Sequence, residues 1–200
     1  MTKRIAIIVE GTTEKVFKAV LQEYLSKKFP GAMPRLKFIS DDGRIPKGVK
    51  LKRDGRHLLE QRYDAVIALT DVYTGTTPPE FTNAVDAKKK MRRWVGVEPR
   101  FHPHAAQFEF EAWLLPYWST IQRLAGSNRN PPAQNPETVD HDKPPTKHLA
   151  ELFRTGSNKR AYSKTRDGAA ILRGQDLDVS ATRCPEFRAF LDIILREAVP

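Results

Sequence analysis

Two acidic residues stand directly after apolar stretches that are typical of buried β-strands. Glu10 follows residues 5–9, and Asp71 follows residues 65–70. In open parallel sheets, ligands bind beyond the carboxyl ends of the strands. Two neighbouring carboxylates repel each other unless a proton or a cation intervenes, and Mg²⁺ is a hard cation that prefers oxygen ligands. The pattern therefore predicts a metal-binding pair, Glu10 and Asp71, whereas the plainer alternative is that each acid is a solvated loop residue.

Three further carboxylates are candidates for the same site. Glu14 lies four residues after Glu10, in the first turn of an expected helix, where the helix dipole alone would favour an acid. Glu109 and Glu111 belong to the aromatic segment FEFEAW, residues 108–113. On a helix only one of this pair would face the site, whereas in an extended segment both would share one face. A buried carboxylate here needs a partner, which is either a metal or an arginine.

The order of apolar patterns predicts the layered fold that would position these acids. Strands are expected at 4–9, 36–39, 65–70 and about 100–106, and helices at 12–29, 56–62 and 84–94. The Gly- and Lys-rich stretch 40–55 is expected to be a loop. Strands that alternate with helices indicate an α/β fold with a parallel sheet flanked by helices.

Beyond residue 106 the pattern becomes helical and irregular. A helix is expected at 109–118, a Pro-rich loop at 126–145, and short helices at 147–153, 162–172 and 185–195. Long irregular segments inside compact domains are usually functional or mobile. We therefore expect an α/β domain over residues 1–107 and a helical C-terminal part over residues 108–200 that packs on the same domain.

Composition excludes several classes of protein. The 200 residues hold one cysteine, Cys184, which rules out an internal disulfide framework and any multi-cysteine zinc site. No apolar run approaches the roughly 20 residues that cross a bilayer. The apolar stretch at residues 5–9 is also too short for a signal peptide. A cytoplasmic location without membrane attachment is therefore expected.

The excess of basic residues points to a polyanionic partner. Lys and Arg number 34 against 24 Asp and Glu, which gives a formal net charge of +10. Such a surface attracts nucleic acid, because neutralising phosphates releases counterions. Two basic stretches supply the candidates for this contact: Lys50, Lys52 and Arg53 in the first, and Lys89, Arg92 and Arg93 in the second. Charge runs are more often solvated faces, and Arg92 and Arg93 could instead pair with acids of a protein partner.

The segment IIVEGTTE, residues 7–14, resembles the first motif of Toprim domains, a fold shared by topoisomerases, primases and OLD-family nucleases. Asp71 falls where the Toprim aspartate motif ends the third strand. More closely, the chain resembles a bacterial family of Toprim-like proteins of unknown function, often encoded beside ABC- or AAA-type ATPases and associated with phage defence. The matching pieces, in chain order, are EGTTE (10–14), TDVY (70–73), EFEAWLL (109–115), PTK (145–147), YSK (162–164) and RCPEF (183–187).

This resemblance implies a Mg²⁺- or Mn²⁺-dependent nuclease that cleaves phosphodiester bonds of DNA or RNA, as the effector of an ATPase-linked phage-defence system. Carboxylate-held metal would supply the nucleophile and neutralise charge at phosphorus. Glu10 and Asp71 would form the core of the metal site, with Glu14 and either Glu109 or Glu111 completing it. The chain has no Gly-x-x-x-x-Gly-Lys-Ser/Thr loop, so another chain would supply the ATPase.

The resemblance also implies a catalytic cation, Lys164, in the YSK piece. A cation beside the phosphate would stabilise the transition state; the plainer alternative is a solvated lysine. Two residues depart from the family pattern: Tyr73 stands where the wider Toprim pattern has a second Asp, and Phe108 where the closer family has a His. One metal ligand is thus missing or supplied from elsewhere. The alternative function is a non-catalytic subunit that binds a partner ATPase or nucleic acid on a degenerate Toprim scaffold.

Overall fold

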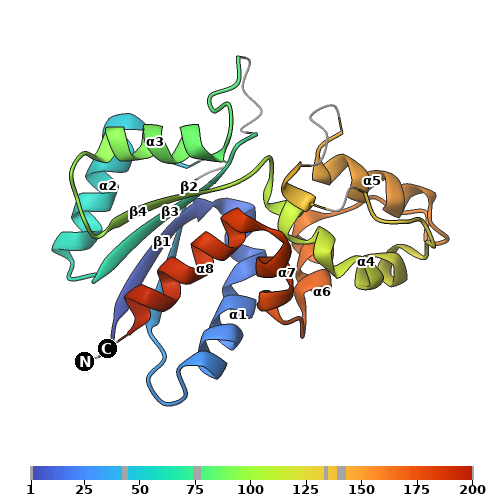
Figure 1. The fold of residues 1–200 in the computed structure, drawn as a ribbon, viewed down its shortest axis with the longest axis horizontal. Coiled ribbons are helices and arrows are strands. Elements are labelled where there is room, and N and C mark those ends of the chain that lie inside the picture. The colour runs from blue at the N-terminus through green and yellow to red at the C-terminus, as the bar shows by residue number, and fades with distance from the viewer. Residues whose placement is uncertain (1, 42–44, 74–77, 133–134, 139–142, 200) are drawn as a thin grey trace.

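A four-stranded parallel sheet forms the centre of the molecule (Figure 1). The computed structural model describes residues 2–199 except 42–44, 74–77, 133–134 and 139–142, and leaves out the side chains of residues 12–15 and 41. The strands are β1 (Arg4–Glu10), β2 (Arg35–Asp41), β3 (Ala65–Asp71) and β4 (Phe101–Ala106), in the order β2-β1-β3-β4. Val9 of β1 pairs with Leu69 of β3, so the two strands end beside each other, as predicted.

Helices cover both faces of the sheet because its strands are apolar on both sides. Ile5, Ile7 and Val9 of β1 point toward α1 (Gly11–Lys28) and α8 (Pro185–Ala198). The alternate residues Ala6 and Ile8 point toward α2 (Gly48–Glu60) and α3 (Ala84–Val95). A continuous apolar strand covered on both faces is typical of a parallel sheet.

Most of the C-terminal part lies beside the carboxyl ends of the strands, whereas its last helix, α8, runs back across one face of the sheet (Figure 1). Its elements are η1 (Phe110–Trp113), η2 (Leu115–Tyr117), α4 (Trp118–Ala125), η3 (Pro136–Thr138), α5 (Pro145–Thr155), the π-helical turn η4 (Lys164–Gly168), α6 (Ala169–Leu172), α7 (Leu177–Arg183) and α8. One apolar cluster runs from β1 and α1 into these segments. Among the described residues, no helix is both long and apolar enough to cross a membrane.

The predicted loop at 40–55 is wrong over its second half, because α2 already begins at Gly48. Leu51, Gly55 and Leu58 form part of the stripe that the helix buries against the sheet. Gly55 suits this stripe because the helix passes close to an aromatic ring: a Cβ there would lie 3.5 Å from the side chain of Phe101. A glycine inside a helix therefore marks close packing here and not a break.

Two predicted C-terminal helices are also corrected. The helix expected at 109–118 is replaced by the short 3-10 turns η1 and η2 before α4 begins at Trp118. Pro116 explains the difference, since it lacks the N–H that would continue the helix. The helix expected at 162–172 becomes a π-helical turn followed by four residues of α6. Helix α7 was not expected at all.

Phe17 connects α1 to segments that are distant in the sequence. Its ring centroid lies 5.8 Å from that of Phe110, 5.7 Å from that of Phe187 and 5.8 Å from that of Phe190. All four side chains are buried. The sheet-covering helix α1 and the C-terminal part thus share one packed aromatic cluster.

Replacing Phe17 with alanine should lower the free energy of unfolding by about 3–5 kcal/mol, because it removes a buried ring and leaves a cavity. Urea denaturation should show a single transition at a lower midpoint with an unchanged slope. Val179→Ala, at a side chain that is 46% exposed, is the control and should change stability by no more than about 0.5 kcal/mol. Two separate transitions, of which only one moves, would contradict the shared core.

Candidate functional site

Glu10 and Asp71 lie together at the carboxyl edge of the sheet. They are the last residues of β1 and β3. Oε1 of Glu10 accepts a hydrogen bond from the Thr70 hydroxyl at 3.0 Å and lies 3.4 Å from the backbone N–H of Asp71. The sheet register therefore places two carboxylates beside each other, at the position where α/β proteins bind ligands.

Lys164 lies between two buried carboxylates. Its ammonium nitrogen is 3.4 Å from Oδ2 of Asp71 and 3.4 Å from Oε2 of Glu111. Glu111 is only 1% exposed, and its Oε2 accepts no well-formed hydrogen bond within the described part of the chain. The Tyr162 hydroxyl lies 3.5 Å from the other Glu111 oxygen. Acids from β1, β3 and η1 thus gather near one ammonium group.

Burial disfavours the charged forms of the acids in this site. Burial, followed by the neighbouring Asp71 carboxylate, raises the pKa of Glu10 to about 7. Burial also raises the pKa of Glu111 to about 7, although Lys164 acts in the opposite direction. Burial disfavours the charged form of Lys164, but Asp71, Glu111 and Glu10 outweigh it, so the pKa of Lys164 is raised. Lys164 is therefore firmly protonated beside two acids that bind protons unusually tightly.

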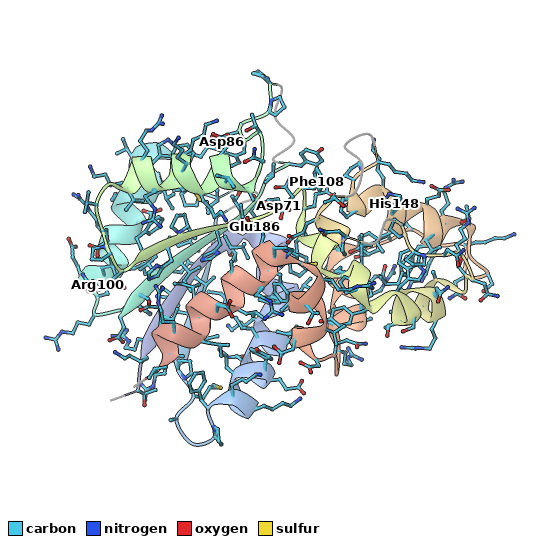
Figure 2. The ribbon with its side chains drawn as sticks, in the orientation of Figure 1. Asp71, Asp86, Arg100, Phe108, His148 and Glu186 are labelled. Carbon is cyan, nitrogen blue, oxygen red and sulfur yellow. The ribbon has the colours of Figure 1, made fainter. Side chains whose placement is uncertain are left out.

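A strained turn after β4 carries Glu111 into the site. Phe108 has a φ of 66°, which is rare for a bulky residue and costs on the order of 1–3 kcal/mol. The carbonyl of Phe108 accepts a hydrogen bond from the Tyr73 N–H at 2.8 Å, and the two rings lie 5.3 Å apart. Oδ1 of Asp71 accepts from the Phe110 N–H at 2.8 Å. Figure 2 shows Asp71 and Phe108 close together between the sheet and the C-terminal helices.

Glu109 and Glu111 have different surroundings. Oε2 of Glu109 accepts a hydrogen bond from the backbone N–H of Thr146 at 3.0 Å, in the first turn of α5. This carboxylate satisfies one of the amide donors that a helix start leaves unpaired. Only Glu111 of this pair contacts Lys164. Glu14 lies in the first turn of α1, but its side chain is outside the described residues.

Asp167 holds the π-helical turn that carries Lys164. This carboxylate is 1% exposed and accepts two hydrogen bonds from Arg160, at 2.7 and 2.9 Å. It also accepts from Nε of Arg166 at 3.0 Å and from the Ser163 N–H at 2.7 Å. Turns of the π-helical type occur frequently at functional sites. Sequence reasoning missed Asp167, because no periodic pattern marks a carboxylate that is buried by its own turn.

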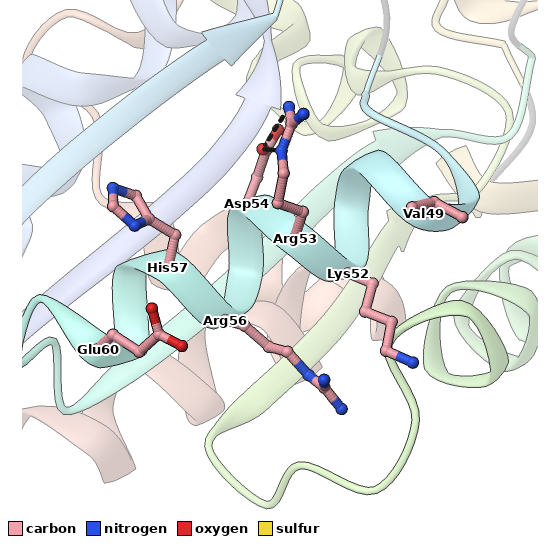
Figure 3. Close-up of a pocket in the computed structure, with 7 residues that line it drawn as sticks. All are labelled: Val49, Lys52, Arg53, Asp54, Arg56, His57 and Glu60. Carbon is pink, nitrogen blue, oxygen red and sulfur yellow. Dashed lines mark hydrogen bonds and ion pairs between the residues drawn. The ribbon is translucent and has the colours of Figure 1, made fainter.

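The predicted nucleic-acid-binding residues lie elsewhere in the fold. Lys50, Lys52 and Arg53 are on α2, and Lys89, Arg92 and Arg93 are on α3. These helices cover the face of the sheet opposite α1 and α8 (Figure 1). The hollow along α2, about 580 Å³, is also separate from the carboxylates, since all of its described lining residues belong to α2 (Figure 3).

Within the described ranges, no group of three or more His, Cys, Asp or Glu side chains is arranged around a common metal position. Asp71 and Glu111 converge on the ammonium of Lys164 instead. An ammonium group and a metal ion compete for the same carboxylate oxygens. The present arrangement is therefore that of acids which are already paired with a cation from the protein.

Comparisons with known proteins give a family and a fold. A family model described as "Domain of unknown function (DUF4276)" matches residues 9–195. No curated protein matches the chain. The chain is similar to the C-terminal region of the Burkholderia pseudomallei OLD protein, at 15% identity with a TM-score of 0.54 over 100% of both chains. It also matches the C-terminal region of the Xanthomonas campestris pv. campestris OLD protein, at 14% identity and a TM-score of 0.43, over 96% of this chain and 97% of that one.

The similarity to the Burkholderia pseudomallei protein shows a shared fold only. The predicted class, a Toprim-like parallel sheet flanked by helices with a helical C-terminal part, is confirmed.

Asp167→Asn should destabilise the protein by about 3 kcal/mol at pH 7, because it leaves Arg160 without its buried counter-charge. Burial alone would raise the pKa of Asp167, but hydrogen bonds from Arg166, Ser163 and Arg160 outweigh it and lower the pKa. A lowered pKa stabilises the fold above the ordinary value, about 3.9, and this contribution disappears as pH falls through the lowered value.

Urea denaturation between pH 7 and pH 2 checks this expectation. The stability difference between wild type and Asp167→Asn should shrink as the pH falls below about 3.9. Asp54→Asn is the control, since Asp54 forms an ion pair with Arg53 whose side chain is 70% exposed. Its effect should stay below about 1 kcal/mol at every pH. A constant difference for Asp167→Asn across the whole range would show that its charge does not stabilise the turn.

Proposed function

The chain belongs to the DUF4276 family, and we propose that it is a metal-dependent nuclease that cleaves phosphodiester bonds of nucleic acid. One observation carries this proposal: carboxylates from β1, β3 and η1 gather near Lys164 at the carboxyl edge of a parallel sheet. Phosphodiester hydrolysis needs a water nucleophile and positive charge near the phosphorus. Acids that hold a cation, together with a fixed ammonium group, meet both needs.

Glu10, Asp71 and Glu111 have the chemistry to hold a divalent cation such as Mg²⁺ or Mn²⁺. Asp71 and Glu111 share one ammonium group, Glu10 lies beside Asp71, and Oε2 of Glu111 lacks a hydrogen-bond partner in the described structure. Hard divalent cations select carboxylate oxygens in this kind of setting. We assign the cation to these three acids, with Glu14 as a further candidate. When bound, it would lower the pKa of a water molecule and neutralise phosphate charge.

The protein's own residues divide the remaining tasks. Lys164 stays protonated because of its acidic neighbours, so its ammonium group can stabilise the negative charge that develops on the phosphate oxygens. Asp167 positions the backbone turn from which Lys164 extends. Glu109 positions α5, which is consistent with a supporting role at the rim of the site.

The biological setting that we propose comes from sequence resemblance. It is an effector that cleaves DNA or RNA in the cytoplasm, within a phage-defence system that contains an ABC- or AAA-type ATPase on another chain. The fold supports this setting only in that it matches an OLD-protein region. Co-purification of the protein with the product of a neighbouring ATPase gene would test the partnership directly.

A second candidate function is favoured by the pairing of Lys164. The ammonium group already compensates Asp71 and Glu111, and Tyr73 packs on Phe108 where the wider Toprim pattern has a second acid. A site completed in this way could be a structural remnant. The protein would then be a non-catalytic subunit that binds a partner ATPase or nucleic acid.

Mg²⁺ should raise the melting temperature of the wild type, because an ion that binds only the folded protein stabilises it by about 2.7 kcal/mol at 100 times its Kd. Glu10→Gln and Asp71→Asn should retain or slightly gain stability without metal, since each removes carboxylate repulsion. Both variants should respond much less to Mg²⁺. Glu23→Gln, an exposed acid on α1, is the matched control and should respond like the wild type. Equal responses in all four proteins would contradict the metal assignment.

Lys164→Met should lower the rate of Mn²⁺-dependent cleavage by about 100-fold or more, as expected for a lost group that stabilises transition-state charge. Mn²⁺ should bind this variant at least as tightly as the wild type, since a competing positive charge is removed. Lys18→Met, on the exposed side of α1, should leave both quantities unchanged. A wild type that neither binds Mn²⁺ nor cleaves any DNA or RNA tested would favour the non-catalytic function.

A further inference from the structure

The two basic stretches of the sequence form one surface in the structure. α2 and α3 lie side by side on the same face of the sheet (Figure 1), and Leu51 and Leu58 of α2 belong to the same apolar cluster as Met91 and Val95 of α3. Their outer sides are therefore continuous. We call this surface the basic layer, and its outward basic side chains are Lys50, Lys52, Arg53 and Arg56 of α2 and Lys89, Arg92 and Arg93 of α3.

The basic layer carries most of the net charge of the protein. α2 and α3 contain nine Lys and Arg against three Asp and Glu, a net charge of +6 out of the chain's +10. The helices have only 13 and 12 of the 200 residues. A charge excess concentrated on one face creates a strong local potential, whereas the same charge spread evenly would not.

Several of these side chains lack an acidic partner within the described part of the chain. Lys52, Arg56, Lys89, Arg92 and Arg93 form no ion pair with any described residue. Figure 3 shows Lys52 and Arg56 extending from α2 beside the hollow of about 580 Å³, while the dashed lines join only Arg53 and Asp54. Their positive charges are therefore available to an external ligand.

The chemistry of the layer fits phosphates and does not fit stacked bases. The aromatic residue of α3, Trp94, is half-buried and packs on Phe81 at 6.1 Å. Proteins that bind single strands rely on exposed aromatic platforms, and protein interfaces rely on aromatic anchors. The outward side chains of α2 and α3 provide neither. A regular polyanion with its phosphates on the outside, which is a nucleic-acid duplex, is the matching occupant.

The position of the layer connects it to the carboxylates. α2 follows β2 and α3 follows β3, so both helices begin near the carboxyl edge of the sheet and run back along it. Figure 2 shows Asp86, at the start of α3, near Asp71. Arg100 lies farther from Asp71, at the opposite edge of the sheet. A duplex along the helices would reach the candidate site with one end only.

We propose that the basic layer binds the phosphate backbone of a nucleic-acid duplex, without sequence preference and without metal. This inference deepens the proposed function, because it names the substrate that the nuclease would act on and the surface that holds it. The layer and the carboxylates are separate sets of residues. Binding and cleavage can therefore be measured independently.

Fluorescence anisotropy with a labelled 20-base-pair duplex of random sequence, in EDTA, tests the proposal. Arg92→Glu/Arg93→Glu on α3 should weaken binding at least tenfold and reduce the slope of log K against log salt by about 2. Arg53→Glu/Arg56→Glu on α2 should behave similarly. The matched control is Arg123→Glu/Arg154→Glu, which changes net charge equally at exposed sites near the ends of α4 and α5. It should weaken binding no more than about threefold, through net charge alone.

The melting temperature of each variant is measured first. If a charge-reversal variant is unfolded, Arg92→Gln/Arg93→Gln is used in its place. No binding of wild type at low salt, or equal losses in the layer and control variants, would overturn the proposal. Tighter binding to a labelled single strand of the same length would overturn the assignment to a duplex. Layer-dependent binding in EDTA without cleavage in Mn²⁺ would support the layer while refuting the nuclease. Metal-dependent cleavage with no effect of the layer variants would support the nuclease while refuting the layer as its binding surface.

Discussion

The candidate site depends on one constraint: three carboxylates are kept close together at a largely buried edge of the sheet. Glu10 and Asp71 are adjacent because β1 and β3 are adjacent, and Glu111 joins them from a segment about 40 residues later. Buried carboxylates are costly unless a cation or proton compensates them. Lys164 provides one positive charge, and burial still raises the pKa values of Glu10 and Glu111 to about 7. A cation bound here would offset the cost of keeping these buried carboxylates charged, which makes this edge of the sheet a candidate for metal chemistry.

Two irregular backbone segments serve this arrangement. Phe108 adopts a positive φ where the chain turns from β4 back toward Asp71, and the π-helical turn brings Lys164 to Asp71 from a different segment. Neither conformation is favourable by itself. Each is held by hydrogen bonds, from the Tyr73 N–H in the first case and to the buried Asp167 carboxylate in the second. Strain that is maintained by specific contacts beside a cluster of charges is more consistent with a functional site than with a neutral remnant.

The sequence predicted the parts of this site that depend on regular structure. Glu10 and Asp71 could be placed together because strand ends in a parallel sheet meet at one edge. It could not decide between Glu109 and Glu111, since that choice required either a helix or a strand and η1 is neither. The prediction of a loop over 40–55 is wrong at 48–55 because a Gly- and Lys-rich composition is typical of loops, although Gly55 is where α2 packs on Phe101. Asp167 had no periodic signal, because its role arises from arginines that fold around it.

The separation of charge explains why an overall excess of +10 was ambiguous in the sequence. In three dimensions Glu10, Asp71 and Glu111 gather at the carboxyl edge of the sheet, while a net charge of +6 lies on α2 and α3. A polyanion attracted to these helices would be repelled by the carboxylates at their near end unless a cation compensated them. On this proposal, attachment and approach to the site would be controlled by different groups. The helices would determine where a duplex lies, and the positive charge held by Glu10, Asp71 and Glu111 would determine whether a phosphate can come near them. Under the proposed function, the basic layer would thus bind a duplex without committing it to reaction until the carboxylates hold a cation.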